Sequence, residues 1–138
     1  ENCLSWPSNV SSTPIEITER NGPLFCHFKR LNPGSGGKGR HRGGLGQEIM
    51  FECTADTPLT AMFMTERTRF PAPGLDNGGE GGIGAVEIND QPVDVSQEFI
   101  LEKGDRVLLR TPGGGGYGSI SQRADLLIES DKSLGYVV

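Results

Sequence analysis

Three cationic side chains lie within one glycine-rich segment. Lys38, Arg40 and Arg42 lie in the run GSGGKGRHRGGLG, which spans residues 34–46. Backbone N–H groups of such a loop can turn toward a common point and cationic side chains add charge-assisted hydrogen bonds, so this pattern favours an anion. The structural alternative is a tight connection whose cations pair with the carboxylates of this acidic chain. Arg69, in the later motif RFPAPGL, is a further candidate for anion binding or for an interface.

A second glycine run precedes a tyrosine in the stretch TPGGGGYG. Neither run matches a nucleotide-binding loop: Gly39 follows Lys38 where a Walker loop needs Ser or Thr, and no GxGxxG opens a helix. Consecutive glycines after a strand instead favour close packing of backbone on backbone, or a sharp turn that presents the tyrosine. The residues of this glycine-rich loop are Gly113, Gly114, Gly115, Gly116 and Tyr117.

The sequence does not contain a complete set of residues for a metal site or for a catalytic triad. His27 lies in a strand-like run and His41 lies between two arginines, so neither segment predicts a histidine-rich metal site. No GxSxG motif marks a nucleophilic serine, which argues against a Ser-His-Asp hydrolase. The carboxylates that could act as catalytic acids are Glu16, Glu19, Asp76, Asp105 and Asp131. The default interpretation of each is a solvated charge on the protein surface. We therefore assign no catalytic residue and no metal ligand within this chain.

The elements that must position these residues are short strands. Residues 24–29 alternate, with Leu24, Cys26 and Phe28 on one face, and residues 47–54 alternate in the same way. Further strands are expected at 60–70, 85–88, 93–95, 99–101 and 107–110, with turns at 89–90 and 103–105.

Helices are expected to be scarce. The apolar spacing within residues 122–133 predicts at most one short helix, stopped at Gly135. Residues 1–22 are polar and contain two prolines, so we expect an irregular N-terminal segment. Seven or eight short strands with frequent turns predict a mainly β fold, an antiparallel sandwich or a partly closed barrel with glycine-rich loops.

Composition narrows the class of protein. The chain has 138 residues, the size of one domain, and its net charge of −5 argues against a nucleic-acid partner. No apolar run reaches the roughly 18 residues that a membrane span needs. Three cysteines without a metal-ligand spacing favour reduced thiols and a cytoplasmic location. Because the chain begins without a methionine, we expect it to be part of something longer.

The motifs, taken in order along the chain, resemble the C-terminal part of the hydantoinase B family. That family includes the B subunit of N-methylhydantoinase and the matching half of oxoprolinase, with acetone carboxylase as a relative. The resemblance runs from about Ser12 to Val138. It rests on STPIE, SGGKGRHRGGLG, RFPAPGL with a following Gly-Gly, Gly-Asp, TPGGGGYG, and finally Asp131 with GYV.

The resemblance implies an ATP-dependent amidohydrolase that opens cyclic amides such as hydantoins, oxoproline or lactams with water. A hydantoinase A-type subunit or domain would bind ATP, while the divalent metal and the catalytic residues would belong to the B-type region upstream. Residues 1–138 are then a single β-rich domain with a structural or interface role in an oligomer, inactive by itself and without a cofactor of its own. Two alternatives stay open: a ketone carboxylase of the acetone carboxylase type, and a stand-alone anion-binding β module.

Overall fold

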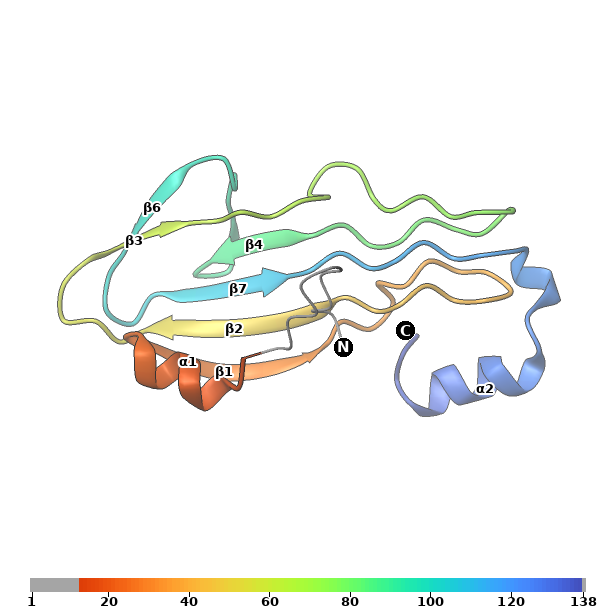
Figure 1. The fold of residues 1–138 in the computed structure, drawn as a ribbon, viewed down its shortest axis with the longest axis horizontal. Coiled ribbons are helices and arrows are strands. Elements are labelled where there is room, and N and C mark those ends of the chain that lie inside the picture. The colour runs from red at the N-terminus through yellow and green to blue at the C-terminus, as the bar shows by residue number, and fades with distance from the viewer. Residues whose placement is uncertain (1–12, 138) are drawn as a thin grey trace.

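The computed structural model describes residues 13–137 as an elongated molecule, with strands at one end and glycine-rich segments at the other (Figure 1). An antiparallel sheet has the strand order β1-β2-β7-β4-β5, and a second sheet pairs β3 with β6. The strands are β1 (Leu24–Leu31), β2 (Gln47–Cys53), β3 (Leu59–Met62), β4 (Ala85–Ile88), β5 (Gln91–Pro92), β6 (Glu98–Leu101) and β7 (Arg106–Arg110). The helices are α1 (Ile15–Asn21), the single 3-10 turn η1 (Ile120–Gln122) and α2 (Asp125–Ser133).

The small core lies between the two sheets. Cys53 of β2, Val86 of β4 and Val107 of β7 are buried on one face of the larger sheet, where Leu101 of β6 and Leu59 of β3 pack against them. Fully burying a side chain of the Val or Leu type contributes about 1.5–3 kcal/mol. This two-layer arrangement confirms the predicted mainly β class, and within residues 13–137 the sheets do not close into a barrel.

The opposite face of the larger sheet carries an ion-pair ladder. Glu48 of β2 accepts hydrogen bonds from Arg30 Nε of β1 at 2.8 Å and from Arg110 Nε of β7 at 2.9 Å. Arg110 also donates to Glu87 of β4, so the ladder crosses four strands. Burial raises the pKa of Glu48, but the hydrogen bonds from Arg110 and Arg30 outweigh it and hold the pKa below its ordinary value.

One predicted strand face is wrong because β1 contains a bulge. Cys26 pairs with Phe51, yet Phe28 pairs with Met50, so the register shifts by one residue at His27. An extra residue in one strand moves every following side chain to the other face. Phe28 therefore lies on the face opposite Cys26, and His27 Nε2 lies 2.8 Å from a carboxylate oxygen of Glu52.

Helices are more frequent than the sequence predicted. Helix α1 occupies residues 15–21 of the segment expected to be irregular, and the Glu19 carboxylate accepts the Cys26 backbone N–H at 2.8 Å, which ties α1 to β1. Residues 1–12 of that segment lie outside the described residues. Helix α2 is the one short helix that the sequence predicted within residues 122–133, and Gly135, with φ +67°, follows its end as predicted, so α1 is the helix that was not expected.

Strand lengths and turns follow the sequence only in part. The strand expected over residues 60–70 is confined to β3, and residues 93–95 are not a strand. Asn89 and Asp90 both have positive φ, 50° and 63°, as a two-residue hairpin turn between β4 and β5 requires. Gly104, with φ +94°, provides the predicted turn before β7.

Candidate functional site

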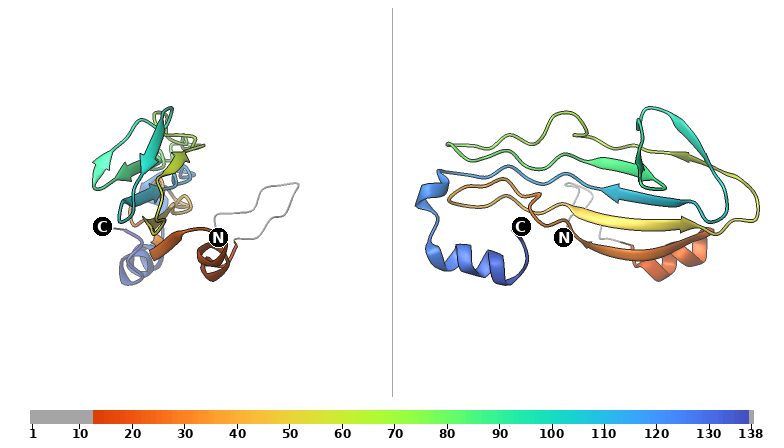
Figure 2. Two further views of the ribbon diagram at one scale, coloured as in Figure 1. Left: turned by 90° about the vertical axis from the view of Figure 1, so that its left-hand side faces the viewer. Right: turned by 180° about the vertical axis from the view of Figure 1, so that it is seen from behind.

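Three glycine-rich segments continue beyond the sheet and lie side by side (Figures 1 and 2). We call them the glycine bundle: residues 34–46 between β1 and β2, residues 71–84 before β4, and residues 111–118 after β7. The third segment is bonded to both of the others, because the Gly114 N–H donates to the Gly44 carbonyl at 2.9 Å and the Gly116 N–H donates to the Gly79 carbonyl at 2.9 Å. Backbone hydrogen bonds therefore hold the bundle together in place of side-chain packing.

The four consecutive glycines, residues 113–116, pack their α-carbons against different neighbouring backbone segments. A Cβ on Gly113 or Gly116 would strike the backbone of residues 35–38, whereas one on Gly115 would strike the carbonyl of Pro73. A Cβ on Gly114 would meet residues 43–44 at 3.3 Å or more. Contact with the same neighbour recurs after three residues, which is the repeat of an extended polyproline-II-like helix. Three of the four glycines are thus places where a neighbouring backbone occupies the position of a side chain.

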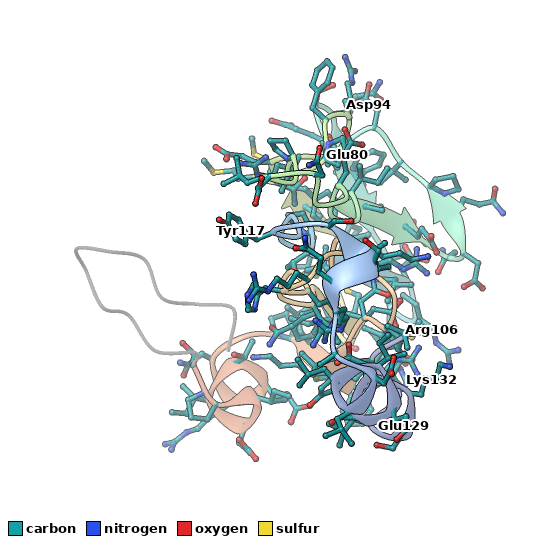
Figure 3. All side chains as sticks on the ribbon, turned by 90° about the vertical axis from the view of Figure 1, so that its right-hand side faces the viewer. Glu80, Asp94, Arg106, Tyr117, Glu129 and Lys132 are labelled. Atoms are coloured by element: carbon teal, nitrogen blue, oxygen red, sulfur yellow. The ribbon has the colours of Figure 1, made fainter. Side chains whose placement is uncertain are left out.

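Tyr117 follows the four glycines of the segment 111–118, and its side chain is exposed to solvent. Its side chain projects away from the glycine segments (Figure 3), and the residue is 50% exposed. The His41 ring lies 6.1 Å from the Tyr117 ring, centroid to centroid. These two exposed rings come from different glycine-rich motifs, and the fold makes them neighbours.

Helix α2 is fastened to the bundle by one carboxylate between two guanidinium groups. Asp131 Oδ1 accepts from Arg42 Nε at 3.3 Å, and Asp131 Oδ2 accepts from Arg123 Nη2 at 2.6 Å. Arg42 also donates to the Gly43 carbonyl at 2.8 Å, and its guanidinium carbon lies 5.1 Å from the ring centroid of Tyr136. We call these three charged residues the Arg42–Asp131–Arg123 cluster.

A pocket of about 330 Å³ lies beside this cluster, between the bundle and α2. Its charged lining is Lys38, Arg42, Arg123 and Asp131. Its remaining lining is Gly34, Gly36, Gly39, Ile120, Ile128 and Val137. The pocket thus joins a charged end to an apolar wall, a combination typical of small-molecule sites.

The four candidate cations lie in three different places. Lys38 and Arg42 line the pocket, whereas the Arg40 residue is exposed and contributes its backbone carbonyl, which accepts from Arg123 Nη1 at 3.0 Å. Arg69 lies elsewhere, where its charge acts on Asp94. Asp94 has a lowered pKa chiefly because the Ser96 backbone and side chain donate to it, with Arg69 adding a smaller effect.

Sequence reasoning missed Arg123, and it placed Asp131 among several possible acids and in the last motif of the family resemblance without assigning it a partner. Asp131 and Arg42 are 89 residues apart in the chain, and Arg123 lies in an unremarkable polar stretch before α2. No local spacing brings such residues together, so only the folded chain reveals the cluster.

Within residues 13–137, no group of three or more His, Cys, Asp or Glu side chains is arranged to hold a metal ion. Within the same range, no helix has the length and apolar character needed to span a bilayer.

Comparison with known proteins gives a family match. Residues 2–120 match the family Hydantoinase B/oxoprolinase. The chain is 36% identical over 124 residues to the uncharacterized protein MJ0963 of Methanocaldococcus jannaschii, covering 87% of this chain and 22% of that protein. It is 34% identical over 122 residues to 5-oxoprolinase 1 of Arabidopsis thaliana, covering 81% of this chain and 9% of that protein. The chain thus spans about a fifth or less of the length of these relatives.

Two solved structures share the fold. The ATP-dependent caprolactamase of Pseudomonas jessenii superposes with a TM-score of 0.74 at 25% identity, covering 92% of this chain and 23% of that one. Nucleotide-free acetone carboxylase superposes with a TM-score of 0.66 at 18% identity, covering 96% of this chain and 22% of that one. The second likeness, at its lower identity, concerns the fold alone. With the sequence match covering most of its length, the chain belongs to the hydantoinase B/oxoprolinase family.

Proposed function

We propose that this chain is a β-rich domain at the C-terminal end of a hydantoinase B-type protein, and that the complete enzyme opens cyclic amides with ATP. The observation that carries the proposal is the family match over residues 2–120. The likeness to an ATP-dependent caprolactamase supports the same reaction class. In that reaction one water adds across the ring C–N bond, and a second water is consumed as ATP is converted to ADP and phosphate.

The domain itself has a structural role in this proposal. Many of its large apolar side chains are exposed: Met64 is 100% exposed, Phe70 80% and Leu126 80%. Contiguous exposed apolar patches mark protein interfaces, and we propose that these side chains belong to such surfaces. We infer that the rest of the B-type chain and a hydantoinase A-type partner cover these side chains in an oligomer, and that the isolated domain is inactive. ATP, the divalent metal and a cytoplasmic location belong to the complete enzyme.

The test combines the complete B-type protein with its A-type partner and measures release of ADP with caprolactam, 5-oxoproline or hydantoin. ADP release that depends on one of these cyclic amides, with a product heavier than the substrate by one water, is the expected result. Absence of any such turnover with all three would count against the proposal.

A ketone carboxylase is the second candidate, because acetone carboxylase shares this fold. The same assay separates the two functions when acetone and bicarbonate replace the cyclic amide. A carboxylated ketone and no ring-opened acid would favour the carboxylase.

A further inference from the structure

The pocket beside the Arg42–Asp131–Arg123 cluster has an excess of positive charge. Among the described residues that line it, Lys38, Arg42 and Arg123 supply three cations and Asp131 one carboxylate, a sum of +2 in a chain whose net charge is −5. The Arg42 and Arg123 side chains are only 19% and 11% exposed. Charge that is largely removed from water is costly unless an opposite charge compensates it. The pocket therefore favours an anion.

Donors are available for that anion. Each oxygen of Asp131 already accepts from one guanidinium, so the carboxylate is engaged on both sides. A guanidinium has five N–H donors, and the described contacts use two of Arg42 and two of Arg123. Within residues 13–137 no hydrogen bond or ion pair engages the Lys38 ammonium, although Lys38 lines the pocket.

The remaining wall defines the rest of the ligand. Ile120, Ile128 and Val137 make it apolar, and the glycines of residues 34–39 contribute backbone without side chains. A volume of about 330 Å³ is sufficient for a charged head group and a short alkyl chain. A bare inorganic anion would leave the apolar wall without a partner.

We propose that this pocket binds a small organic carboxylate. Its oxygens accept hydrogen bonds from Lys38, Arg42 and Arg123, and its alkyl chain packs on Ile120, Ile128 and Val137. Guanidinium groups fit carboxylate oxygens in a planar, charge-assisted geometry. This inference rests on the pocket alone and does not require the proposed ATP-dependent activity.

Calorimetric titration of the chain with acetate, butyrate, hexanoate and inorganic phosphate tests the proposal. Affinity should rise along the carboxylate series, by about fourfold for each methylene group that becomes buried. Equal affinity for acetate and hexanoate would overturn the proposed alkyl subsite. Binding of phosphate alone would overturn the assignment to carboxylates, and no saturable binding of any of the four would overturn the site.

A matched pair of variants locates the binding. Lys38→Gln removes one ammonium group that the described fold does not use, and we expect hexanoate binding to weaken about tenfold or more. Lys132→Gln removes the same charge from α2 at an exposed position outside the pocket lining, and its affinity should stay within twofold of the parent (Figure 3). Circular dichroism checks that both variants are folded. Equal effects of the two substitutions would contradict the placement of the carboxylate at Lys38.

Discussion

His41 and Tyr117 exchange two backbone hydrogen bonds, the N–H of each donating to the carbonyl of the other at 2.9 Å. His41 belongs to the motif RHRGGLG and Tyr117 to TPGGGGYG, so two distant glycine-rich motifs meet at one pair. Tyr117 also forms a parallel bridge with Leu75 of the remaining segment, residues 71–84. The motifs that mark this family in the sequence are thus parts of a single structural unit, the glycine bundle.

Replacing Gly116 with alanine should destabilise the bundle. A Cβ at Gly116 would collide with the carbonyl of Lys38, a backbone atom held in place by its own hydrogen bond from Gly79. Forcing extra atoms into packed structure costs about 1–3 kcal/mol or more. Urea unfolding followed by circular dichroism should show a loss of at least that size in Gly116→Ala.

Gly44 supplies the control for this prediction. A Cβ there meets no atom of the described part of the chain within 4 Å, so Gly44→Ala should be neutral, or stabilising by up to about 1 kcal/mol because alanine restricts the unfolded chain. Equal stability of Gly116→Ala and Gly44→Ala would show that the bundle is not backbone-packed as described.

Short-range sequence signals predicted several of the strands, β2 most completely. The β2 alternation places Ile49, Phe51 and Cys53 on the core face because a strand buried on one side needs period two. Asn89 and Asp90 tolerate positive φ, so the hairpin turn was also visible from residue type.

Long-range features escaped prediction for physical reasons. The bulge at His27 depends on the register between β1 and β2, which no single strand sequence specifies. Helix α1 is seven residues long and none of its residues is buried, so its apolar pattern is weak. Arg123 acquires its role only where the chain brings η1, α2 and residues 34–46 together.

Gly135 should be needed for the end of helix α2. The Gly135 N–H donates to the Lys132 carbonyl and the Tyr136 N–H donates to the Asp131 carbonyl, the bonds of a Schellman motif. Because φ is +67° and no atom of residues 13–137 lies within 4 Å of the missing Cβ, we expect Gly135→Ala to have only a backbone cost, about 1–2 kcal/mol. Urea unfolding should show this loss, and a smaller one for Gly135→Asn, since asparagine tolerates this conformation better. Identical losses for both substitutions would contradict the explanation.

Asp131→Asn should loosen helix α2 from the bundle. The substitution keeps the shape of the side chain but leaves Arg42 and Arg123 without their shared carboxylate, and removing one partner of a buried ion pair costs about 3–5 kcal/mol. Hydrogen exchange should become faster in α2 and in residues 34–46. Glu129→Gln, an exposed carboxylate of the same helix (Figure 3), is the matched control and should leave exchange unchanged. Unchanged exchange in Asp131→Asn would show that the cluster does not hold the helix.

Glu48→Gln should change how the stability of the chain depends on pH. The pKa of Glu48 is lowered in the folded state because the hydrogen bonds from Arg110 and Arg30 outweigh the effect of burial. A carboxyl group whose pKa is lower in the folded state stabilises the fold at pH values above its pKa in the unfolded chain, which is about 4.3. This stabilisation is lost as the pH falls through the pKa of the folded state.

The free energy of unfolding of Glu48→Gln should therefore be lower than the parent's by about 1–3 kcal/mol at pH 7, because Arg30 and Arg110 lose their charged acceptor. The difference should shrink as the pH falls below about 4, where the parent's carboxylate takes up a proton. Glu98→Gln, on an exposed position of β6, should follow the parent at every pH. Urea unfolding from pH 7 to pH 3 measures all three proteins, and parallel curves for Glu48→Gln and the parent would exclude Glu48 as the source of this pH dependence.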